Sequence, residues 1–253
     1  MLKQVNKLIC TGVILSSLSM IAQADVVDNI SQSFDVSNSP RLHLQNINGD
    51  VSITAWDKSV IQVNATITAD SQKDRDLVSV VIEQTGRGIE VESKYKKNTH
   101  NKGSSAEVVY KVMVPSATDL STISLVNGSL VIGAVKGGIE AELVNGTFKA
   151  KDIAGNANIS SVNGSVKLHY SDDIEQLEEI KLEAVNGSIK LYLPEGIGAD
   201  VSVDTMHGSI KNDFGLSVDK NMFTGKNLNG TIGNGHVDID IETVNGSVKI
   251  LNN

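Results

Sequence analysis

One short phrase, an apolar residue followed by Asn-Gly, recurs along the chain and limits what it can fold into. It reads "VNGSVK" at 162–167 and again at 244–249, with "VNGTFK", "VNGSIK" and "MHGSIK" as variants. The doublets follow one another at intervals of 16 to 23 residues, a period typical of stacked or radial repeats. They are Asn127-Gly128, Asn145-Gly146, Asn163-Gly164, Asn186-Gly187, His207-Gly208, Asn229-Gly230 and Asn245-Gly246.

The residues that flank the doublets are apolar in two columns. One apolar residue stands directly before each doublet, and another stands two positions after its glycine. Apolar and polar residues also alternate ahead of the doublets, as in "IEAELVNG" at 139–146 and "VDIDIETVNG" at 237–246. Such alternation predicts strands with one buried face. Each repeat is therefore predicted to be two short strands joined at a corner, with Val and Ile filling the core.

Two all-β architectures fit this repeat. Asn-Gly between alternating strands is a strong hairpin signal, which predicts a meander. Seven doublets with like flanking residues instead favour a parallel β-solenoid, in which each repeat is one rung and the doublet is its corner. Glycine is expected there because the backbone would strain other residues by roughly 1–3 kcal/mol, and stacked Asn amides could hydrogen-bond between rungs. We favour the solenoid for 116–253, preceded by a β-rich part at 25–115.

The first 24 residues have the layout of a secretory signal peptide. Lys3 and Lys7 precede an apolar run that ends in Ala-Gln-Ala before Asp25. Cys10, the one cysteine, lies inside this segment, so the exported chain is predicted to lack disulfides and thiolate metal sites. No later segment is long and apolar enough for a transmembrane helix. An exported protein is expected, in the periplasm rather than on the cell surface or secreted.

The charge balance excludes one class of partner. Without Lys3 and Lys7, 20 basic residues face 30 acidic ones, a net charge near −10. Nucleic acids require a positive field on the protein, so no nucleic-acid partner is expected.

The order and number of the doublets resemble those of the bacterial "putative adhesin" domains of unknown function, which are related to the head-GIN adhesins. The matching stretches are "INGDVSI" (47–53), "VVYKVMVP" (108–115), the run of doublets, "LYLPEGIGADVSVDTMHGSI" (191–210) and "VNGSVKI" (244–250). The resemblance covers most of 40–251 and implies an exported β-solenoid. It supplies no catalytic residues. His207 departs from the usual Asn, and "FGLSVDKNMFTGKN" (214–227) interrupts the pattern.

A column of lysines stands three residues after the corner glycines. Lys149, Lys167, Lys190 and Lys211 are predicted to form a ladder on four consecutive rungs, about 4.8 Å apart. Like charges on adjacent strands are destabilising. Either acids on the neighbouring strand neutralise them, or the ladder is a linear anion site for an envelope polymer that carries phosphates or carboxylates. The candidate neutralising acids are Glu142, Glu183, Asp204 and Glu242.

Little else in the sequence carries chemistry. The acidic segment "SDDIEQLEEI" (171–180) has five carboxylates that could hold Ca²⁺ or simply face solvent, and no catalytic, cofactor or metal set is evident. The sequence favours a non-enzymatic, adhesin-like envelope module whose partner is an envelope glycan or another envelope protein. The alternatives are a polysaccharide-active β-helix enzyme and an accessory protein in envelope-stress signalling.

Overall fold

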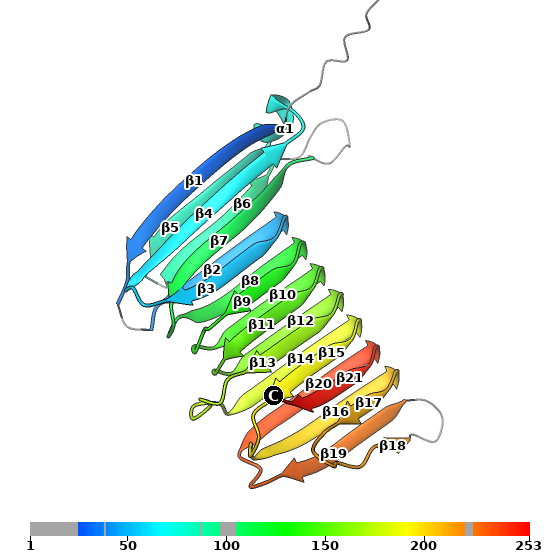
Figure 1. Cartoon of the computed structure of the whole chain (residues 1–253). Helices are drawn as coiled ribbons and strands as arrows, with labels where there is room; N and C mark the ends of the chain where they lie inside the picture. The colour runs from blue at the N-terminus through cyan, green and yellow to red at the C-terminus, as the bar shows by residue number, and fades with distance from the viewer. Residues whose placement is uncertain (1–24, 38, 87, 97–104, 221–224) are drawn as a thin grey trace, which may run out of the picture.

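The chain folds almost entirely into β-strands. The computed structural model describes residues 25–253 except 38, 87, 97–104 and 221–224, so the predicted signal peptide at 1–24 lies outside it. In the described residues the strands form two large, mostly parallel sheets, and the helix α1 (Gln72–Arg75) is one turn long. The two sheets run along the molecule as a double row of stacked strands (Figure 1).

Each sheet has one continuous strand order. Sheet A runs β1 (Val26–Asp35), β4 (Val60–Ala69), β7 (Glu107–Pro115), β3 (Val51–Trp56), β9 (Leu130–Gly133), β11 (Phe148–Ile153), β13 (Val166–Tyr170), β15 (Ile189–Leu193), β21 (Val248–Asn252) and β17 (Ile210–Asn212). Sheet B runs β18 (Asp219–Lys220), β19 (Lys226–Ile232), β16 (Ala199–His207), β20 (Val237–Asn245), β14 (Glu179–Asn186), β12 (Ala157–Asn163), β10 (Ile139–Asn145), β8 (Asp119–Asn127), β2 (Arg41–Asn48), β6 (Gly88–Tyr95) and β5 (Val78–Thr85).

The central part is built from pairs of strands that we call rungs. In each rung, a strand of sheet B ends at an Asn-Gly or His-Gly doublet, and the chain continues into a strand of sheet A. Neighbouring rungs pair in parallel and in register, for example Asn145 with Asn163 and Phe148 with Val166. Because the two strands that flank a doublet lie in different sheets, the hairpin meander is wrong.

The rungs do not stack in the order of the sequence. From β2/β3 the order follows the chain through β8/β9, β10/β11, β12/β13 and β14/β15. The next rung is β20/β21, from the C-terminal part of the chain, and β16/β17 comes only after it. Figure 1 shows this rung in red between the yellow β14/β15 and the golden β16/β17.

The core fills the space between the two sheets. Along β20, Val237, Ile239 and Ile241 are buried, whereas Asp238 and Asp240 between them are exposed. One apolar cluster extends from Leu42 to Ile250, and each fully buried aliphatic side chain contributes about 1.5–3 kcal/mol. Both sheets continue past residue 115 without a break, and the proposed division into 25–115 and 116–253 remains a prediction.

A ladder of amides runs along the corners. From Asn127 onward, the side-chain Nδ2 of each corner asparagine donates to the Oδ1 of the asparagine in the preceding rung of the stack, at 2.9–3.0 Å. Its members, in spatial order, are Asn48, Asn127, Asn145, Asn163, Asn186 and Asn245. Asn48, from "INGDVSI", is a member that the doublet count omitted, and His207 occupies the next position beside Asn245.

The corner glycines are required by close stacking rather than by an unusual backbone angle. The φ of Gly49 is +116°, but Gly164, Gly187 and Gly246 do not have a left-handed φ. The expected backbone strain is therefore not the general reason for glycine here. A Cβ on Gly164 would instead overlap the carbonyl oxygen of Gly146, and one on Gly187 would overlap that of Gly164. Each rung thus lies too close to the next for any side chain at this position.

Antiparallel strands close both ends. β1, β4 and β7 pair antiparallel at one end of sheet A, as do β5 and β6 in sheet B. At the other end β19 pairs antiparallel with β16. Asn229-Gly230 lies inside β19, with Gly230 opposite Val201. The expectation that this doublet forms a corner is therefore wrong, because its strand runs against the direction of the rungs.

Candidate functional site

A row of lysines crosses the outer face of sheet A. Lys149 pairs with Lys167, Lys167 with Lys190, Lys190 with Lys249, and Lys249 with Lys211. The predicted ladder of Lys149, Lys167, Lys190 and Lys211 is therefore interrupted, because Lys249 on the inserted rung separates Lys190 from Lys211. The resulting lysine row has five members and is about 19 Å long at the usual strand spacing.

The acids expected to neutralise the lysine row lie on the other side of the molecule. Glu142, Glu183, Asp204 and Glu242 are on strands of sheet B, and their side chains alternate with the buried ones. They therefore face outward from sheet B, away from the lysines. Among the described residues, none of the five lysines forms a salt bridge within 4 Å. The predicted neutralisation is wrong, because the corner carries the chain to the opposite face between acid and lysine.

Two aromatic rings lie beside the middle of the lysine row. His169 and Tyr192 follow Lys167 and Lys190 by two residues, pair across β13 and β15, and stack with centroids 5.1 Å apart. The Nζ of Lys167 lies 5.0 Å from the centroid of the Tyr192 ring. The Nδ1 of His169 is buried without a hydrogen-bond partner among the described residues. Two partly exposed aromatic rings, stacked on each other, thus lie beside the cationic row.

A second row, of apolar side chains, is exposed on the outer face of sheet B. The residues directly before the corners were expected to help fill the core, yet they are 36–53% exposed. Only the column after each glycine, which includes Phe148 and Val166, is buried. The exposed members are Ile47, Val126, Val144, Val162, Val185, Val244 and Met206. These residues alternate with the buried side chains of their strands, so they lie on the outward side of sheet B.

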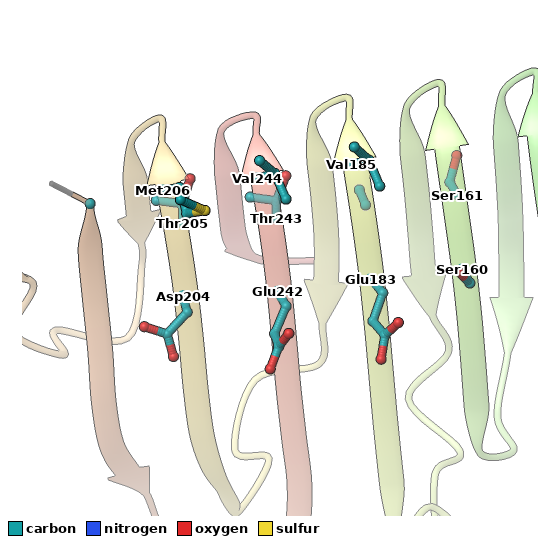
Figure 2. A pocket seen from close by; sticks show the side chains of 12 residues that line it. Ser160, Ser161, Glu183, Val185, Asp204, Thr205, Met206, Glu242, Thr243 and Val244 are labelled. Atoms are coloured by element: carbon teal, nitrogen blue, oxygen red, sulfur yellow. The ribbon is translucent and has the colours of Figure 1, made fainter.

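The acids of sheet B run parallel to this apolar row. Glu183, Glu242 and Asp204 lie on adjacent strands and, with Val185, Val244 and Met206, line a shallow hollow of about 300 Å³ (Figure 2). Lys181, on β14, donates a hydrogen bond to Glu183 and lies 3.1 Å from it, which raises the pKa of this lysine. The face as a whole remains strongly acidic, with Asp200, Asp238 and Asp240 also exposed.

Comparisons with known proteins agree with this architecture. The family model "Toastrack DUF4097" matches residues 123–251. The chain belongs to the Toastrack family. The region that matches contains all five lysines of the row and every corner from Asn127 to Asn245, but not Asn48 or the N-terminal antiparallel strands.

Solved structures that resemble this Toastrack chain are distant in sequence. A putative cell adhesion protein from Clostridium sporogenes is 14% identical, with a TM-score of 0.52, over 89% of this chain and 100% of that one. A putative adhesin from Bacteroides fragilis is also 14% identical, with a TM-score of 0.43, over 88% and 97%. The first likeness supports the fold, and no curated protein matches the chain.

Neither a metal-binding cluster nor a membrane-spanning helix is found in the described part of this Toastrack chain. No three His, Cys, Asp or Glu side chains there gather in a way that could hold a metal ion. In the acidic segment 171–180, Asp173 forms an ion pair with Lys136 at 2.6 Å. No helix in the described ranges is long and apolar enough to cross a membrane.

Proposed function

We propose that this chain is an exported, non-enzymatic binding module of the cell envelope, and that it holds a linear polyanion along the lysine row. In this proposal it is a parallel β-solenoid with Asn-Gly corners and acts in the periplasm, in an adhesin-like role. The observation that carries the proposal is the lysine row itself. Five like charges on adjacent strands are maintained in an acidic protein without a salt-bridge partner among the described residues.

Electrostatics favours an extended ligand over a compact one. Like charges on adjacent strands repel one another, and a ligand with repeated negative groups would relieve this repulsion along the whole row. Lysine carries its charge at the end of a flexible side chain with rotatable donors. The spacing of the anionic groups along the ligand therefore need not equal the spacing of the strands. The partly exposed rings of Tyr192 and His169 would contact the apolar part of a sugar beside the row. A polymer with phosphates or carboxylates on a glycan backbone fits these features best.

The fold comparison supports the adhesin-like part of the proposal. The Clostridium sporogenes structure, which shares the architecture, is described as a putative cell adhesion protein. Neither alternative function, a polysaccharide-active enzyme or a stress-signalling accessory, has a comparable observation in its favour. An enzyme would require polar groups that converge on one point, whereas this chain arranges them in rows.

The test is binding to immobilised lipopolysaccharide, an acidic glycan and a neutral glycan. A variant with Lys149, Lys167, Lys190, Lys211 and Lys249 changed to Gln is compared with one in which Lys73, Lys94, Lys136, Lys181 and Lys226 are changed to Gln. Both lose the same charge, so a general field effect would weaken both equally. We expect at least about tenfold weaker binding to the acidic ligands only in the first variant. We also expect strong weakening by salt, because exposed charges are screened.

Two results would refute the proposal. One is the absence of binding by the unmodified chain to either acidic ligand at low salt. The other is an equal loss of affinity in the two variants, since the contact would then not be confined to the lysine row.

A further inference from the structure

The outer faces of the two sheets carry opposite charges on the same rungs. On the five rungs from β10/β11 to β16/β17, an outward residue stands three positions before the corner doublet, and a lysine stands three positions after its glycine. The pairs are Glu142 with Lys149, Ser160 with Lys167, Glu183 with Lys190, Glu242 with Lys249, and Asp204 with Lys211. Four of these five rungs therefore present an acid on one face and a lysine on the other. We call the outward residues of sheet B at these positions the acid row.

The two rows cannot satisfy each other within one molecule. The buried core lies between the sheets, so the ammonium groups of the lysine row and the carboxylates of the acid row point in opposite directions. The salt bridges on the acidic face, such as Lys181 with Glu183, involve side chains of sheet B alone. Apart from the pair of Lys181 with Glu183, each row is thus left without the complementary charge that the same chain displays on its opposite face.

We propose that the partner of the acidic face is a second copy of this chain, whose lysine row lies over the acid row. Both rows cross the same five rungs, so both have the same spacing. Both also lie at the same number of residues from the corner edge. A copy shifted perpendicular to the sheets, without rotation, would therefore place lysine over acid on four rungs at once. Another protein would have to reproduce this spacing independently.

The exposed apolar row strengthens the match with lysine in particular. Val144, Val185, Val244 and Met206 lie between the acid row and the corner edge. A lysine side chain has an apolar stem and a charged tip, and it covers apolar surface while its ammonium group remains in a polar environment. In the hollow shown in Figure 2, the stems would cover Val185 and Val244, and the ammonium groups would reach Glu183 and Glu242.

This contact does not close on itself. The surface that each copy offers differs from the surface that it binds, so the contact is heterologous and copies would add to form open stacks. Exposed ion pairs are individually weak, so association is expected to depend on concentration and salt. The inference does not depend on polyanion binding. A polyanion on the lysine row would compete with stacking, whereas the acid row would be needed for stacking alone.

The test is the weight-average mass of the full chain in sedimentation equilibrium. We expect the mass to rise with concentration between about 10 µM and about 1 mM at low salt, and to return to that of a monomer at about 0.5 M salt. One variant carries Lys149→Glu, Lys190→Glu and Lys249→Glu, and a second carries Glu142→Lys, Glu183→Lys and Glu242→Lys. Each alone is expected to remain monomeric.

Mixing the two variants provides the decisive measurement. The lysine row of the second variant faces the intact acids of the first, so an equimolar mixture is expected to associate although neither variant does alone. This restoration excludes misfolding as the cause of the loss. A control with Asp172→Lys, Glu175→Lys and Glu178→Lys changes the net charge equally away from both rows, and it should associate at least as well as the unmodified chain.

The inference would be overturned by a monomer at every concentration at low salt, by a mixture that fails to associate, or by a control that loses association as fully as the second variant. The second variant also separates the two proposals, because it should stop stacking yet retain lipopolysaccharide binding. If it loses neither, the acid row is not the contact. Retention of stacking with no polyanion binding in the unmodified chain would instead leave this inference standing without the proposed function.

Discussion

The central rungs and the antiparallel end of the molecule use the same dipeptide in two different ways. Asn163-Gly164 turns the chain from sheet B into sheet A, whereas Asn229-Gly230 lies within β19. Gly164 packs directly on the backbone of Gly146 in the next rung. Gly230 has no such neighbour, and the atoms nearest to its missing Cβ belong to the side chain of Leu216. An Asn-Gly doublet can therefore form a corner, but it does so only where parallel rungs pack against it.

The largest expected difference is between alanine at these two glycines. Gly164→Ala would drive a Cβ into a backbone carbonyl that cannot move without shifting a whole rung, so we expect a loss of about 3 kcal/mol or more in the free energy of unfolding. Gly230→Ala would meet the end of the flexible Leu216 side chain at 2.9 Å and should cost less than about 1 kcal/mol. Urea denaturation measures both. Equal losses would contradict the stacking explanation.

Alkaline pH should lower the stability of the folded chain through two buried tyrosines, one in the antiparallel N-terminal end and one in the central rungs. Burial raises the pKa of Tyr110, at the N-terminal end, to about 12, and its hydroxyl lies 2.7 Å from that of Ser93. Burial also raises the pKa of Tyr170, in the central rung β12/β13. A raised pKa stabilises the folded chain below pH 10, and the contribution of Tyr110 is lost as the pH rises from 10 through 12, whereas that of Tyr170 continues to be lost at higher pH.

The measurement is urea denaturation at pH 9 and pH 11.5 for the parent, Tyr110→Phe and Tyr170→Phe. A phenylalanine cannot ionise, so each variant should lose less stability between the two pH values than the parent, by at most about 2 kcal/mol for Tyr110. Lysines titrate in the same range in every protein and cancel from the comparison. Identical pH profiles would show that neither tyrosine contributes.

A smaller contrast is expected at the two asparagines. Asn163 donates to Asn145 and accepts from Asn186, so Asn163→Ala removes two amide hydrogen bonds and should cost about 1–2 kcal/mol. Asn229 is exposed in β19, and Asn229→Ala should change the stability by less than about 0.5 kcal/mol. Thermal unfolding followed by circular dichroism would rank the two variants. An Asn163→Ala variant as stable as the parent would mean that the hydrogen bonds of the exposed ladder are no more favourable than those that the same amides make with water.

The smallest expected effect is a gain. His207 stands beside Asn245 at the end of the amide ladder, and His207→Asn would allow one more Nδ2 to donate to the Oδ1 of Asn245. We expect a stabilisation of about 0.5–1 kcal/mol, seen as a higher midpoint in thermal unfolding. His207→Gln serves as the control, because its longer side chain does not fit the spacing of the ladder. A gain in both variants would point instead to the removal of the histidine.

The local sequence pattern was sufficient to predict the rungs, but not the order in which they stack. Alternation around Ile239 and Phe148 predicted which side chains are buried, because a strand has a period of two residues wherever it occurs. The place of Lys249 between Lys190 and Lys211 could not be predicted, since any rung with the same corner fits beside any other. Position in the sequence therefore did not determine position in the stack.

The candidate site was predicted only in part. Lys149, Lys167 and Lys190 are adjacent as expected, but the acids assigned to them are not on their face, because the sequence does not show that the corner separates two sheets rather than two strands of one. The exposure of Val185 was also missed. An apolar residue beside a corner was expected to be buried, although Val185 lies two residues after Glu183 and therefore on the outward side of β14.

The inserted rung also has a mechanical consequence. β20 is held by parallel strands on both sides, β14 and β16, and β21 is held likewise by β15 and β17. A pull along β21 would load two ladders of hydrogen bonds in shear at once, whereas a pull on an edge strand such as β1 would load one. Tension applied near residue 252 would therefore meet resistance from the interior of the stack rather than from one of its edges.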